Sequence, residues 1–490
     1  MTGARGVVAA GHPLTAEAGA QVLREGGNAV DAAVAACLMS WAAEPLLTGP
    51  GAGGFMLIAG SGEEPVLLDF FVAAPSHGER EDLLPVSISF GDAVQLFNVG
   101  GSSCGAFGNP AGLAAATERW GTVDLASLAE PAAKLAREGV ALNKEQAYVF
   151  EILEPILVST AGASAVFAPD GHVLREGDLF RSQELADTIA RFGADGAEPF
   201  YRGDIAAAVV DFVHANGGTL TAADLASYAV QVREPAQATY RERQVLTNPP
   251  PSAGGILLAL SLAQLDRISS GPPTPEQLVT VMQHAQAART PEFDAGLSEP
   301  GFLERFLAAN LGSTTHISVL DADGRACAVT CTNGEGSGLV VPGLGIHVNN
   351  VMGEEDLNPL GFFEAPPGRR MPSMMAPTVV LGEQGVELVI GSAGSNRIRS
   401  AILQAIVGVV DHGLDARSAI EAPRLHVEND VIYTEPGIDN EALRQTGLQM
   451  APFRSRNLFF GGAQAVHRDP ASGRLTGAGD PRRGGVAVEA

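Results

Sequence analysis

The sequence predicts an α+β fold in which antiparallel hairpins, and not alternating β-α-β units, build the sheets. The clearest hairpin alternates apolar and polar residues over 315–320, turns at Asp321-Ala322-Asp323-Gly324 and returns over 326–332. A second hairpin is predicted from the apolar runs 379–381 and 386–390. Alternation that is interrupted by an Asp/Gly cluster is a strong local signal for a hairpin.

The first 60 residues are predicted to form a strand, two helices and a strand. Asn28 and Asp31 have the spacing of a capping box, which would begin an Ala-rich helix. The glycine run 49–54 precedes a strand and lacks the Lys-Ser/Thr ending of a phosphate loop, so it indicates close backbone packing. Residues 66–71 should form the strand that pairs with 55–59.

The middle of the chain is predicted to be mainly helical over 112–189. A second capping box lies at 221–224, and 233–246 is expected to be a strand. The rigid run Pro249 to Gly255 should begin a long apolar helix. Another helix is predicted over 397–410, directly after the second hairpin.

The composition limits the kinds of partner that the protein can have. The 490 residues include 31 basic and 56 acidic ones, a net charge of −25, which argues against binding to nucleic acid or to an anionic membrane. The N-terminus has no apolar run of the length of a signal-peptide core, and no segment of the sequence is apolar over the length of a membrane span, so we expect a cytoplasmic protein. The length suits two ordinary domains or one large one.

The four cysteines are too few for a disulfide framework. Cys327 and Cys331 share one face of a predicted strand, about 13 Å apart at the rise of a strand, which is too far to bridge. We predict that they are small buried apolar residues. The sequence contains no CxxC pair and no HExxH motif, so it supports no metal site, and we expect no cofactor.

The first hairpin brings two threonines together at its open end. The predicted turn would place Thr314 opposite Cys331 and within one residue of Thr332. A threonine hydroxyl is a poor nucleophile unless a base lies beside it, and its own α-amine can be that base if the chain is cut just before it. Thr314 is therefore the candidate nucleophile. His316 should lie on the same face as Thr314, where we predict a structural hydrogen bond and not a catalytic base.

A second signal lies at Gly394-Ser395, where a predicted strand ends and a helix begins. The free N–H groups and the positive dipole end of a helix start suit a developing oxyanion, and each donor can contribute roughly 3 kcal/mol. Each of the two signals is weak alone. A threonine at a strand start is usually structural, and a Gly-Ser helix entry is usually only a turn.

Nearly the whole chain also resembles the γ-glutamyltransferases, a family of N-terminal-nucleophile hydrolases. In the first part of the chain the resemblance rests on 26–33 (GGNAVDAA), 53–56 (GGFM), 131–139 (PAAKLAREG), 200–203 (FYRG) and 249–255 (PPPSAGG), in that order. In the second part it rests on 314–319 (TTHISV), 349–350 (NN), 373–378 (SMMAPT) and 391–397 (GSAGSNR). So many matches in order make the resemblance specific.

The resemblance implies a four-layer αββα sandwich with two stacked antiparallel sheets, made as a single precursor. The hydroxyl of Thr314 would attack the carbonyl of Ser313. Hydrolysis of the resulting ester would leave a large subunit, 1–313, and a small subunit, 314–490, as a heterodimer with one fold. The freed amine of Thr314 would then be the general base for its own hydroxyl.

The resemblance implies roles for further residues. Thr332 would hydrogen-bond the nucleophile, and the N–H groups of Gly394 and Ser395 would hold the oxyanion. The matches to substrate-binding positions are Asn333, Glu354 and Ser373. The loop after Thr332 is shorter than the family pattern, which leaves the match of Asn333 open.

The departures from the family pattern concern the substrate. Where γ-glutamyl-cleaving members have an arginine that grips the substrate's α-carboxylate, this chain has Phe71, and a phenyl ring supplies neither the charge nor the fork. Where the family has a pair of serines, this chain has Ser373-Met374. Where the family has a second oxyanion glycine, this chain has Ser395, which still provides a backbone N–H. We therefore expect a more apolar pocket. Arg369 or Arg370 could replace the missing clamp, although a solvated pair in a loop is the favoured interpretation.

These features predict an autoprocessing threonine hydrolase or acyltransferase that forms an acyl-enzyme from a small amino-acid-derived substrate. A first alternative is a biosynthetic relative, either an acylase or an enzyme that cleaves a C–C bond next to a ketone, as homologues do on the way to the 4-alkylproline units of actinobacterial antibiotics. A second alternative is a relative that does not process itself and only binds a ligand.

Overall fold

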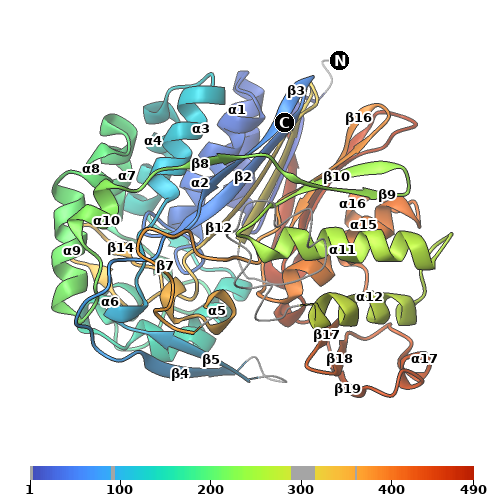
Figure 1. The fold of residues 1–490 in the computed structure, drawn as a ribbon. Helices are drawn as coiled ribbons and strands as arrows, with labels where there is room; N and C mark the ends of the chain where they lie inside the picture. The colour runs from blue at the N-terminus through green and yellow to red at the C-terminus, as the bar shows by residue number, and fades with distance from the viewer. Residues whose placement is uncertain (1–3, 90–93, 289–314, 359–360) are drawn as a thin grey trace.

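A computed structural model describes residues 4–89, 94–288, 315–358 and 361–490 of the chain (Figure 1). Two large antiparallel sheets lie between two groups of helices, which confirms the predicted mixture of helices and antiparallel strands. The seven-stranded sheet has the order β22 (Val486–Glu489), β1 (Gly6–Ala10), β11 (Thr315–Asp321), β12 (Arg325–Thr332), β2 (Gly53–Gly60), β3 (Glu63–Phe70) and β8 (Gln231–Arg233).

The second sheet has six strands, and smaller sheets lie at the periphery. The order of the six is β21 (Leu475–Gly479), β20 (Gln464–Arg468), β16 (Gly385–Gly391), β15 (Thr378–Gly382), β10 (Arg243–Thr247) and β9 (Ala236–Tyr240). The smaller sheets are β4–β5 (Leu84–Ser89, Val94–Val99), β6–β7 (Val140–Ala141, Leu179–Phe180), β13–β14 (Val340–Val341, Ile346–His347) and β17–β18–β19 (Leu425–Glu428, Val431–Thr434, Gln449–Pro452).

The helices fall into two groups along the chain. The first group is α1 (Pro13–Glu25), α2 (Ala29–Ala43), α3 (Asn109–Trp120), α4 (Leu125–Glu138), α5 (Lys144–Leu157), α6 (Ala161–Phe167), α7 (Gln183–Asp195), α8 (Glu198–Tyr201), α9 (Asp204–Ala215) and α10 (Ala222–Ala226). The second is α11 (Ala253–Ile268), α12 (Pro275–Ala287), α15 (Arg397–Val410), α16 (Ala416–Glu421) and α17 (Asn440–Arg444). Short 3₁₀ turns are η1 (Gly101–Ser103), η2 (Val351–Gly353), η3 (Glu355–Leu357), η4 (Leu458–Phe460) and η5 (Pro481–Arg483).

Alternating side chains of the strands are buried on opposite faces of the two sheets. Met56 and Val319 of the seven-stranded sheet pack with the first group of helices. Leu57 and Leu320, their neighbours in sequence, pack instead against residues of the six-stranded sheet such as Val389. The opposite face of the six-stranded sheet packs against α11 and α15. The period-2 pattern of the strands therefore places apolar residues on both faces, as strands that are covered on both sides require.

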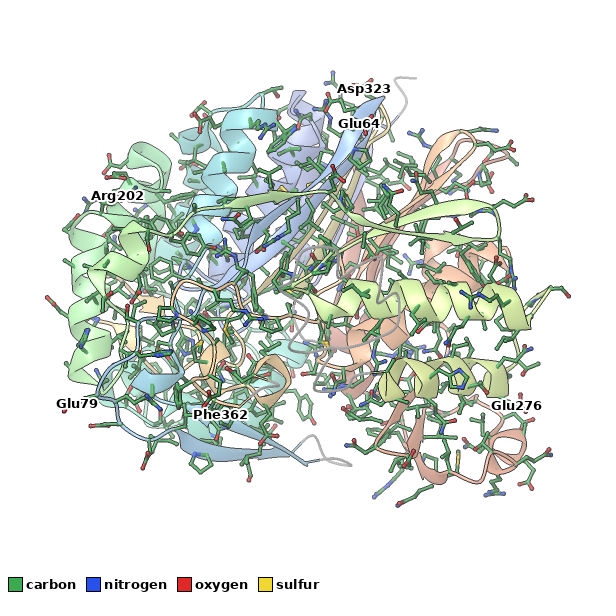
Figure 2. The ribbon with its side chains drawn as sticks, viewed as in Figure 1. Glu64, Glu79, Arg202, Glu276, Asp323 and Phe362 are labelled. Carbon is green, nitrogen blue, oxygen red and sulfur yellow. The ribbon has the colours of Figure 1, made fainter. Side chains whose placement is uncertain are left out.

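The strand order joins the two ends of the chain. β1 lies between β22 and β11, and Arg5 N donates to the carbonyl of Ala490 at 2.8 Å. The residues before and after position 314 thus contribute strands to both large sheets. The charged side chains of Glu79, Arg202 and Asp323 are exposed at the periphery (Figure 2). None of the helices in the described ranges combines the length and the apolar character that crossing a membrane requires.

Most of the predicted elements are confirmed. The capping boxes at Asn28 and Thr221 begin α2 and α10, β2 pairs with β3, and α15 has the predicted bounds. All four cysteines are free and buried, which confirms the predicted burial of Cys327 and Cys331. The prediction of one strand over 233–246 is wrong, because the chain reverses at Arg241 and Glu242 into the hairpin β9–β10. Both turn residues have positive φ, at 48° and 66°, although neither is a glycine, so the sequence carried no turn signal there.

Candidate functional site

The hairpin of β11 and β12 lies in the middle of the seven-stranded sheet. Thr315 pairs with Cys331, whereas the predicted register placed Thr314 there, so the predicted register is wrong by one residue. β11 ends at Asp321 and β12 begins at Arg325, so three residues connect the strands, whereas a pairing of Thr314 with Cys331 requires a turn centred between Ala322 and Asp323. A one-residue change in the turn moves the pairing of the whole hairpin.

Ser313 and Thr314 lie outside the described residues, so the hairpin can be followed back only to Thr315. The Thr315 hydroxyl donates a hydrogen bond to Oε2 of Glu44 at 3.3 Å, and the Thr15 hydroxyl donates to Oε1 at 2.8 Å. Glu44 is only 5% exposed, and this burial raises the pKa of its carboxyl to about 7 although the two hydroxyls act in the opposite direction. A carboxyl that changes its protonation near neutral pH therefore lies beside the first residue of β11.

His316 is held by hydrogen bonds at both of its ring nitrogens. Nδ1 lies 2.8 Å from the hydroxyl of Thr330, and Nε2 lies 2.9 Å from the hydroxyl of Ser318. Because the Ser318 hydroxyl donates to the carbonyl of Gln464, it accepts from His316, which places the imidazole proton on Nε2. Burial lowers the pKa of His316 to about 3. The ring is thus neutral and structural, as predicted.

The loop after β12 gathers three of the predicted residues. The Thr332 hydroxyl accepts a hydrogen bond from the N–H of Gly334 at 2.9 Å, and both Thr332 and Asn333 are buried. Glu354, at the junction of η2 and η3, packs against the same loop, since a Cβ on Gly334 would lie 2.3 Å from its Oε1. The Asn333 amide donates to the carbonyl of His347 at 3.2 Å. Thr332, Asn333 and Glu354 are therefore neighbours.

Gly394 and Ser395 form a sharp turn between β16 and α15. Their φ angles are 118° and 50°, so the backbone of two consecutive residues, including their N–H groups, departs from the strand direction just before α15 begins. A serine in this left-handed region is costly, by roughly 1 kcal/mol, which explains why the family pattern has a glycine there. The N–H groups of Arg397 and Ile398 donate back to the carbonyls of Gly394 and Ser395, at 3.0 and 3.1 Å. Such a backbone turn at the start of a helix can bind an anion, which is compatible with the predicted role of Gly394 and Ser395.

Ser373 and Met374 are buried in a loop that packs on the start of α11. The Ser373 hydroxyl accepts from the N–H of Met375 at 3.1 Å, and its carbonyl accepts from the N–H of Ala253 at 2.7 Å. The chain approaches so closely that a Cβ on Gly254 would lie 2.0 Å from the carbonyl oxygen of Met374. The loop is therefore fixed by backbone contacts.

Phe71 is fully buried and stacks on Phe55, with ring centroids 5.5 Å apart. It belongs to the apolar cluster between the sheets, together with Met352 beside Glu354 and with Met375 after the Ser373 loop. Phe71 is thus a member of this cluster, and Glu354, Ser373 and Met374 lie within two residues of other members along the chain. The Arg370 guanidinium lies at the end of β3, where Nη1 donates to the carbonyl of Phe71 at 2.8 Å.

The interpretation of Arg370 as a solvated loop residue is wrong. Its Nε lies 3.0 Å from Oδ1 of Asp69, and its side chain is only 9% exposed. Asp69 is itself fully buried and also pairs with Arg233 at 2.8 Å. The guanidinium in addition lies over the ring of Tyr228 at 4.5 Å. Because these partners are far away in the sequence, no local pattern announced them.

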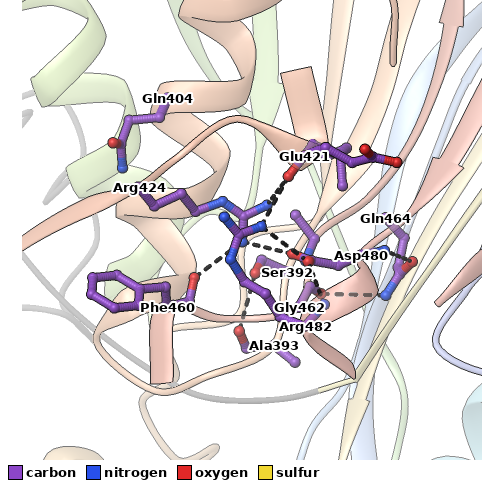
Figure 3. Close-up of polar contacts among 12 residues, drawn as sticks. Ser392, Ala393, Gln404, Glu421, Arg424, Phe460, Gly462, Gln464, Asp480 and Arg482 are labelled. Atoms are coloured by element: carbon purple, nitrogen blue, oxygen red, sulfur yellow. Dashed lines mark hydrogen bonds and ion pairs between the residues drawn. The ribbon is translucent and has the colours of Figure 1, made fainter. Parts of the chain in front are cut away.

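A buried charged network supports the segment that follows the six-stranded sheet (Figure 3). Asp480 is fully buried and lies 2.6 Å from Nη1 of Arg424 and 3.1 Å from Nη1 of Arg482. Its carboxylate also accepts the N–H groups of Ala463 and Arg482, at 2.9 and 3.0 Å. Arg482 further pairs with Glu435, Nε lying 2.8 Å from Oε1. The network fixes η5 against residues 462–464, which lead into β20.

A cavity of about 300 Å³ lies between the loop after α2, helix α5 and the turns η4 and η5. Its lining residues are Gly11, Glu44, Pro45, Leu46, Leu47, Lys144, Glu145, Gln146, Tyr148, Val149, Phe150, Arg456, Asn457, Leu458, Pro481, Arg482 and Arg483. Among the described residues, none of the positions predicted from the sequence lines this cavity. Glu44 connects it to Thr315, and therefore to the start of β11.

Residues 15–490 match the family described as gamma-glutamyltranspeptidase. The chain belongs to this family. It is 31% identical to the glutathione hydrolase proenzyme of Bacillus subtilis (strain 168), over 99% of this chain and 92% of the relative. It is also 31% identical to the Acylase ACY 1 proenzyme of Pseudomonas sp. (strain SE83), over 99% and 94%. The crystal structure of cephalosporin acylase from Bacillus halodurans is similar, with a TM-score of 0.83 and 25% identity over 99% and 96% of the two chains.

Membership of the gamma-glutamyltranspeptidase family supports an enzyme, because these relatives are a hydrolase and acylases.

Three residues near the site were not predicted from the sequence as site residues: Glu44, Asn350 and Arg483. Asn350 closes the loop after β12, because its Oδ1 accepts the N–H groups of Glu335 and Gly336 at 3.0 and 3.2 Å. The Asn349-Asn350 pair was noticed only as a family motif, and no local signal marked Glu44 or Arg483.

The raised pKa of Glu44 predicts a pH-dependent stability. The folded protein keeps a proton up to about pH 7 that the unfolded chain releases near pH 4.5, so the free energy of unfolding should fall as pH rises through this window. The slope is about 1.4 kcal/mol per pH unit. We expect Glu44→Gln to remove this slope, so that its stability relative to the parent protein improves by about 3 kcal/mol between pH 5 and pH 8.

Urea unfolding at several pH values measures this difference. Both proteins should carry Thr314→Ala, so that a single uncut chain is compared. Parallel pH profiles for the two proteins would show that Glu44 is already ionised in the folded state.

Proposed function

We propose that this protein is a proenzyme that cuts itself before Thr314 and then uses the new N-terminal threonine to form an acyl-enzyme. The observation that carries the proposal is the hairpin β11–β12, which follows position 314 in the middle of the larger sheet and ends at the buried Thr332. The relatives, which are named as proenzymes, support it. The cut would separate a large chain, 1–313, from a small chain, 314–490, that remain together as a heterodimer.

In this proposal each catalytic step has a group to perform it. The α-amine of Thr314 takes the proton of its own hydroxyl, whose oxygen forms an ester with the acyl carbon, and the leaving amine departs with a proton. The N–H groups of Gly394 and Ser395 hold the oxyanion, and the hydroxyl of Thr332 orients the nucleophile. Water or a second amine then releases the acyl group. His316 takes no part, because both of its ring nitrogens are engaged.

We further propose that the two large sheets are the inner layers of a four-layer αββα sandwich. The apolar cluster that contains side chains of both sheets supports this arrangement, as do the helix contacts on the outer face of each sheet. The nucleophile would then lie at one end of the space between the sheets. Phe71, on β3's continuation, would line the inner end of that space.

The substrate in this proposal is a small amino-acid-derived amide. Asn333, Glu354 and Ser373 would supply polar contacts, and Met374 and Phe71 an apolar wall. Phe71 is fully buried against Phe55, so this position offers no cation for an α-carboxylate. The likeness to acylases supports an acyl group other than γ-glutamyl.

Hydrolysis of p-nitroanilides tests the proposed function. We expect an initial burst of p-nitroaniline from a simple acyl anilide, and an acyl group on Thr314 that mass spectrometry of the quenched small chain can locate. γ-Glutamyl p-nitroanilide should react at least about tenfold more slowly, because an unpaired carboxylate loses a charge-assisted contact. If the γ-glutamyl compound reacted faster than the simple acyl anilide, the interpretation that Phe71 leaves no site for an α-carboxylate would be refuted. An acyl group on another residue, or on none, would refute the nucleophile.

The apolar surroundings of Phe71 also favour a second candidate, the cleavage of a C–C bond next to a ketone. Thr314 would add to the ketone, and a stabilised carbanion would leave and take a proton in place of an amine. The two candidates share the acyl-enzyme but differ in the group that is released. Product analysis with a β-diketone and with the matched amide separates them.

A further inference from the structure

One face of α15 is fastened to strand β17 along the first turns of the helix. Three residues spaced by four lie above one another on this face: Asn396 at the N-cap, Ser400 and Gln404. Gln404 binds both backbone groups of Leu425, because its amide donates to the carbonyl at 2.9 Å and its side-chain oxygen accepts the N–H group at 3.0 Å. The strand is thus held beside the helix about two helical turns after the backbone turn at 394–395.

Two side chains of β17 make the other two contacts. The amide of Asn396 donates a hydrogen bond to Oε1 of Glu428. The hydroxyl of Ser400 lies 2.8 Å from Nδ1 of His426, and Nε2 of the same ring lies 3.5 Å from Oε2 of Glu428. One carboxylate therefore ends both contacts, with one oxygen towards Asn396 and the other towards His426.

Glu428 has the charge that suits this role. Burial raises the pKa of its carboxyl, but the contact with His426, the charge of Arg397 and the hydrogen bond from Asn396 outweigh it and lower the pKa to about 2. His426 is only 1% exposed, and burial lowers the pKa of its imidazole. The carboxylate is therefore ionised at neutral pH, and an ionised acceptor makes the stronger hydrogen bond to the Asn396 amide.

Asn396 departs from the usual behaviour of an N-cap residue. An asparagine at this position normally accepts an N–H group of the first helical turn with its side-chain oxygen, which stabilises the helix. Asn396 makes no such capping bond. Its Oδ1 is buried and has no hydrogen-bond partner in the part of the chain that the structure describes. The contact with Glu428 thus replaces a local stabilising bond, a breach of local rules that is expected at functional sites.

The turn before Asn396 needs to be held from outside. Ser395 has a φ of 50°, and a serine keeps this unfavourable conformation only where the surrounding structure determines it. Asn396 is the next residue in the chain. A fixed Asn396 side chain therefore restrains the backbone of Ser395 directly.

We propose that Glu428 and Asn396 are positioning residues for the turn that would hold the oxyanion. Glu428 acts through Asn396 and keeps the N–H groups of Gly394 and Ser395 in their direction. Donors that stabilise a transition state must be oriented in advance, because their reorientation during the reaction would add to the barrier. This inference rests on the proposed function, which gives the turn its chemical role.

The first test needs no activity and uses the uncut Thr314→Ala protein. Hydrogen exchange is followed by mass spectrometry in peptides that cover 392–400, where the N–H groups of Arg397 and Ile398 donate back to the turn. Glu428→Leu and Asn396→Ala should each accelerate this exchange by about tenfold, as expected when a hydrogen bond to a charged group is lost. Glu428→Gln keeps an acceptor oxygen and should restore most of the protection.

The matched control for the exchange measurement is Asp430→Asn. This substitution removes an exposed carboxylate two residues beyond Glu428 and should leave the exchange unchanged. If exchange in Glu428→Leu and Asn396→Ala equals that of the parent protein, the contact does not hold the turn and the inference is overturned.

The second test measures catalysis in the processed enzyme with butyryl p-nitroanilide. Glu428→Leu and Asn396→Ala should lower kcat by about 10- to 100-fold, less than or equal to the loss of one oxyanion donor, and should change KM by less than about threefold. The inhibition constant of propylboronic acid, which forms a tetrahedral adduct with boron in place of the acyl carbon, should rise by the same factor as kcat falls. The inhibition constant of butyramide, a ground-state analogue, should stay within about threefold of the parent value.

A double substitution shows whether Glu428 acts through Asn396. Asn396→Ala with Glu428→Leu should be no slower than the slower single variant, because both changes remove one interaction. Effects on kcat that multiply would show that Glu428 acts by another route, which would overturn the inference. Variants that melt at lower temperature but keep the parent kcat and boronate affinity would also overturn it, since the contact would then be structural only.

The outcomes separate the inference from the proposed function. Anilide hydrolysis that depends on Thr314 but not on Glu428 or Asn396 would overturn the inference and leave the function standing. A protein that neither cuts itself nor hydrolyses anilides would refute the function, and the exchange measurement would still decide whether Glu428 holds the turn. The same measurement decides if a variant folds but does not cut itself. If Glu428→Leu does not fold, Asn396→Ala and Glu428→Gln decide.

Discussion

Replacing Thr314 with alanine is expected to leave one chain of 50.4 kDa in place of two, and to reduce anilide hydrolysis by roughly 10⁴-fold or more. The hydroxyl of Thr314 is needed twice, once to attack the carbonyl of Ser313 and once to attack the substrate. Alanine provides no nucleophile for either step. Denaturing gel electrophoresis of the parent protein should show chains of about 32 and 18 kDa, the shares of 313 and 177 residues in the 50.4 kDa of the 490-residue chain.

Two further substitutions make this result specific. Thr314→Ser keeps a hydroxyl and should still give two chains, although more slowly. Thr315→Ser changes the adjacent threonine, keeps the hydroxyl that donates to Glu44, and should cut like the parent protein. Sequencing of the small chain should begin at Thr314. A parent protein that stays whole, and looks the same as Thr314→Ala, would instead support a relative that only binds a ligand.

Replacing Asp480 with alanine is expected to lower the free energy of unfolding by about 3–5 kcal/mol, the usual cost of removing one partner of a buried charge network. Asp480 is fully buried, and its loss would leave Arg424 and part of Arg482 uncompensated. Burial alone would raise the pKa of Asp480, but the two arginines hold it below the ordinary value. The carboxylate is therefore ionised in the folded protein above the ordinary pKa of an aspartate, and its contribution to stability is lost as pH falls from that value through the lowered pKa.

Urea unfolding of the uncut Thr314→Ala protein, with and without Asp480→Ala, measures this loss. The matched control is Glu441→Ala, which removes an exposed carboxylate that pairs with Arg444 on α17. Exposed pairs contribute at most about 1 kcal/mol, so the control should be nearly neutral. Equal effects of the two substitutions would mean that the buried network contributes no more than a surface pair.

The fold could be predicted where the determining contacts are local. The capping boxes at Asn28 and Thr221 span three residues, and both begin helices as expected. The hairpin at 315–332 was recognised by its alternation, but its register was wrong because the length of the turn depends on contacts beyond it. The turn at Arg241-Glu242 was missed because its residues are not those that usually adopt positive φ.

The residues of the candidate site likewise fall into those that could be predicted from the sequence and those that could not. Thr332, Asn333 and Glu354, which the family resemblance assigned to the site, are close to one another, and their chemical roles stay predictions. Glu44 and Arg483 belong to opposite ends of the sequence, and only the packing of the described residues brings them to one cavity. A pairing between residues so distant leaves no periodicity or spacing for a reader of the sequence to detect.

The strand order has a consequence for the two proposed chains. β1 of the large chain would be hydrogen-bonded on one edge to β11 and on the other to β22, both of the small chain, and β10 would continue the six-stranded sheet beside β15. The chains are interleaved and not docked, so neither can leave without breaking strands in the middle of a sheet. Dilution should therefore not release free subunits, and mixing two processed variants should not produce hybrids. Exchange would require unfolding, so a processed molecule keeps its original pair of chains for its lifetime.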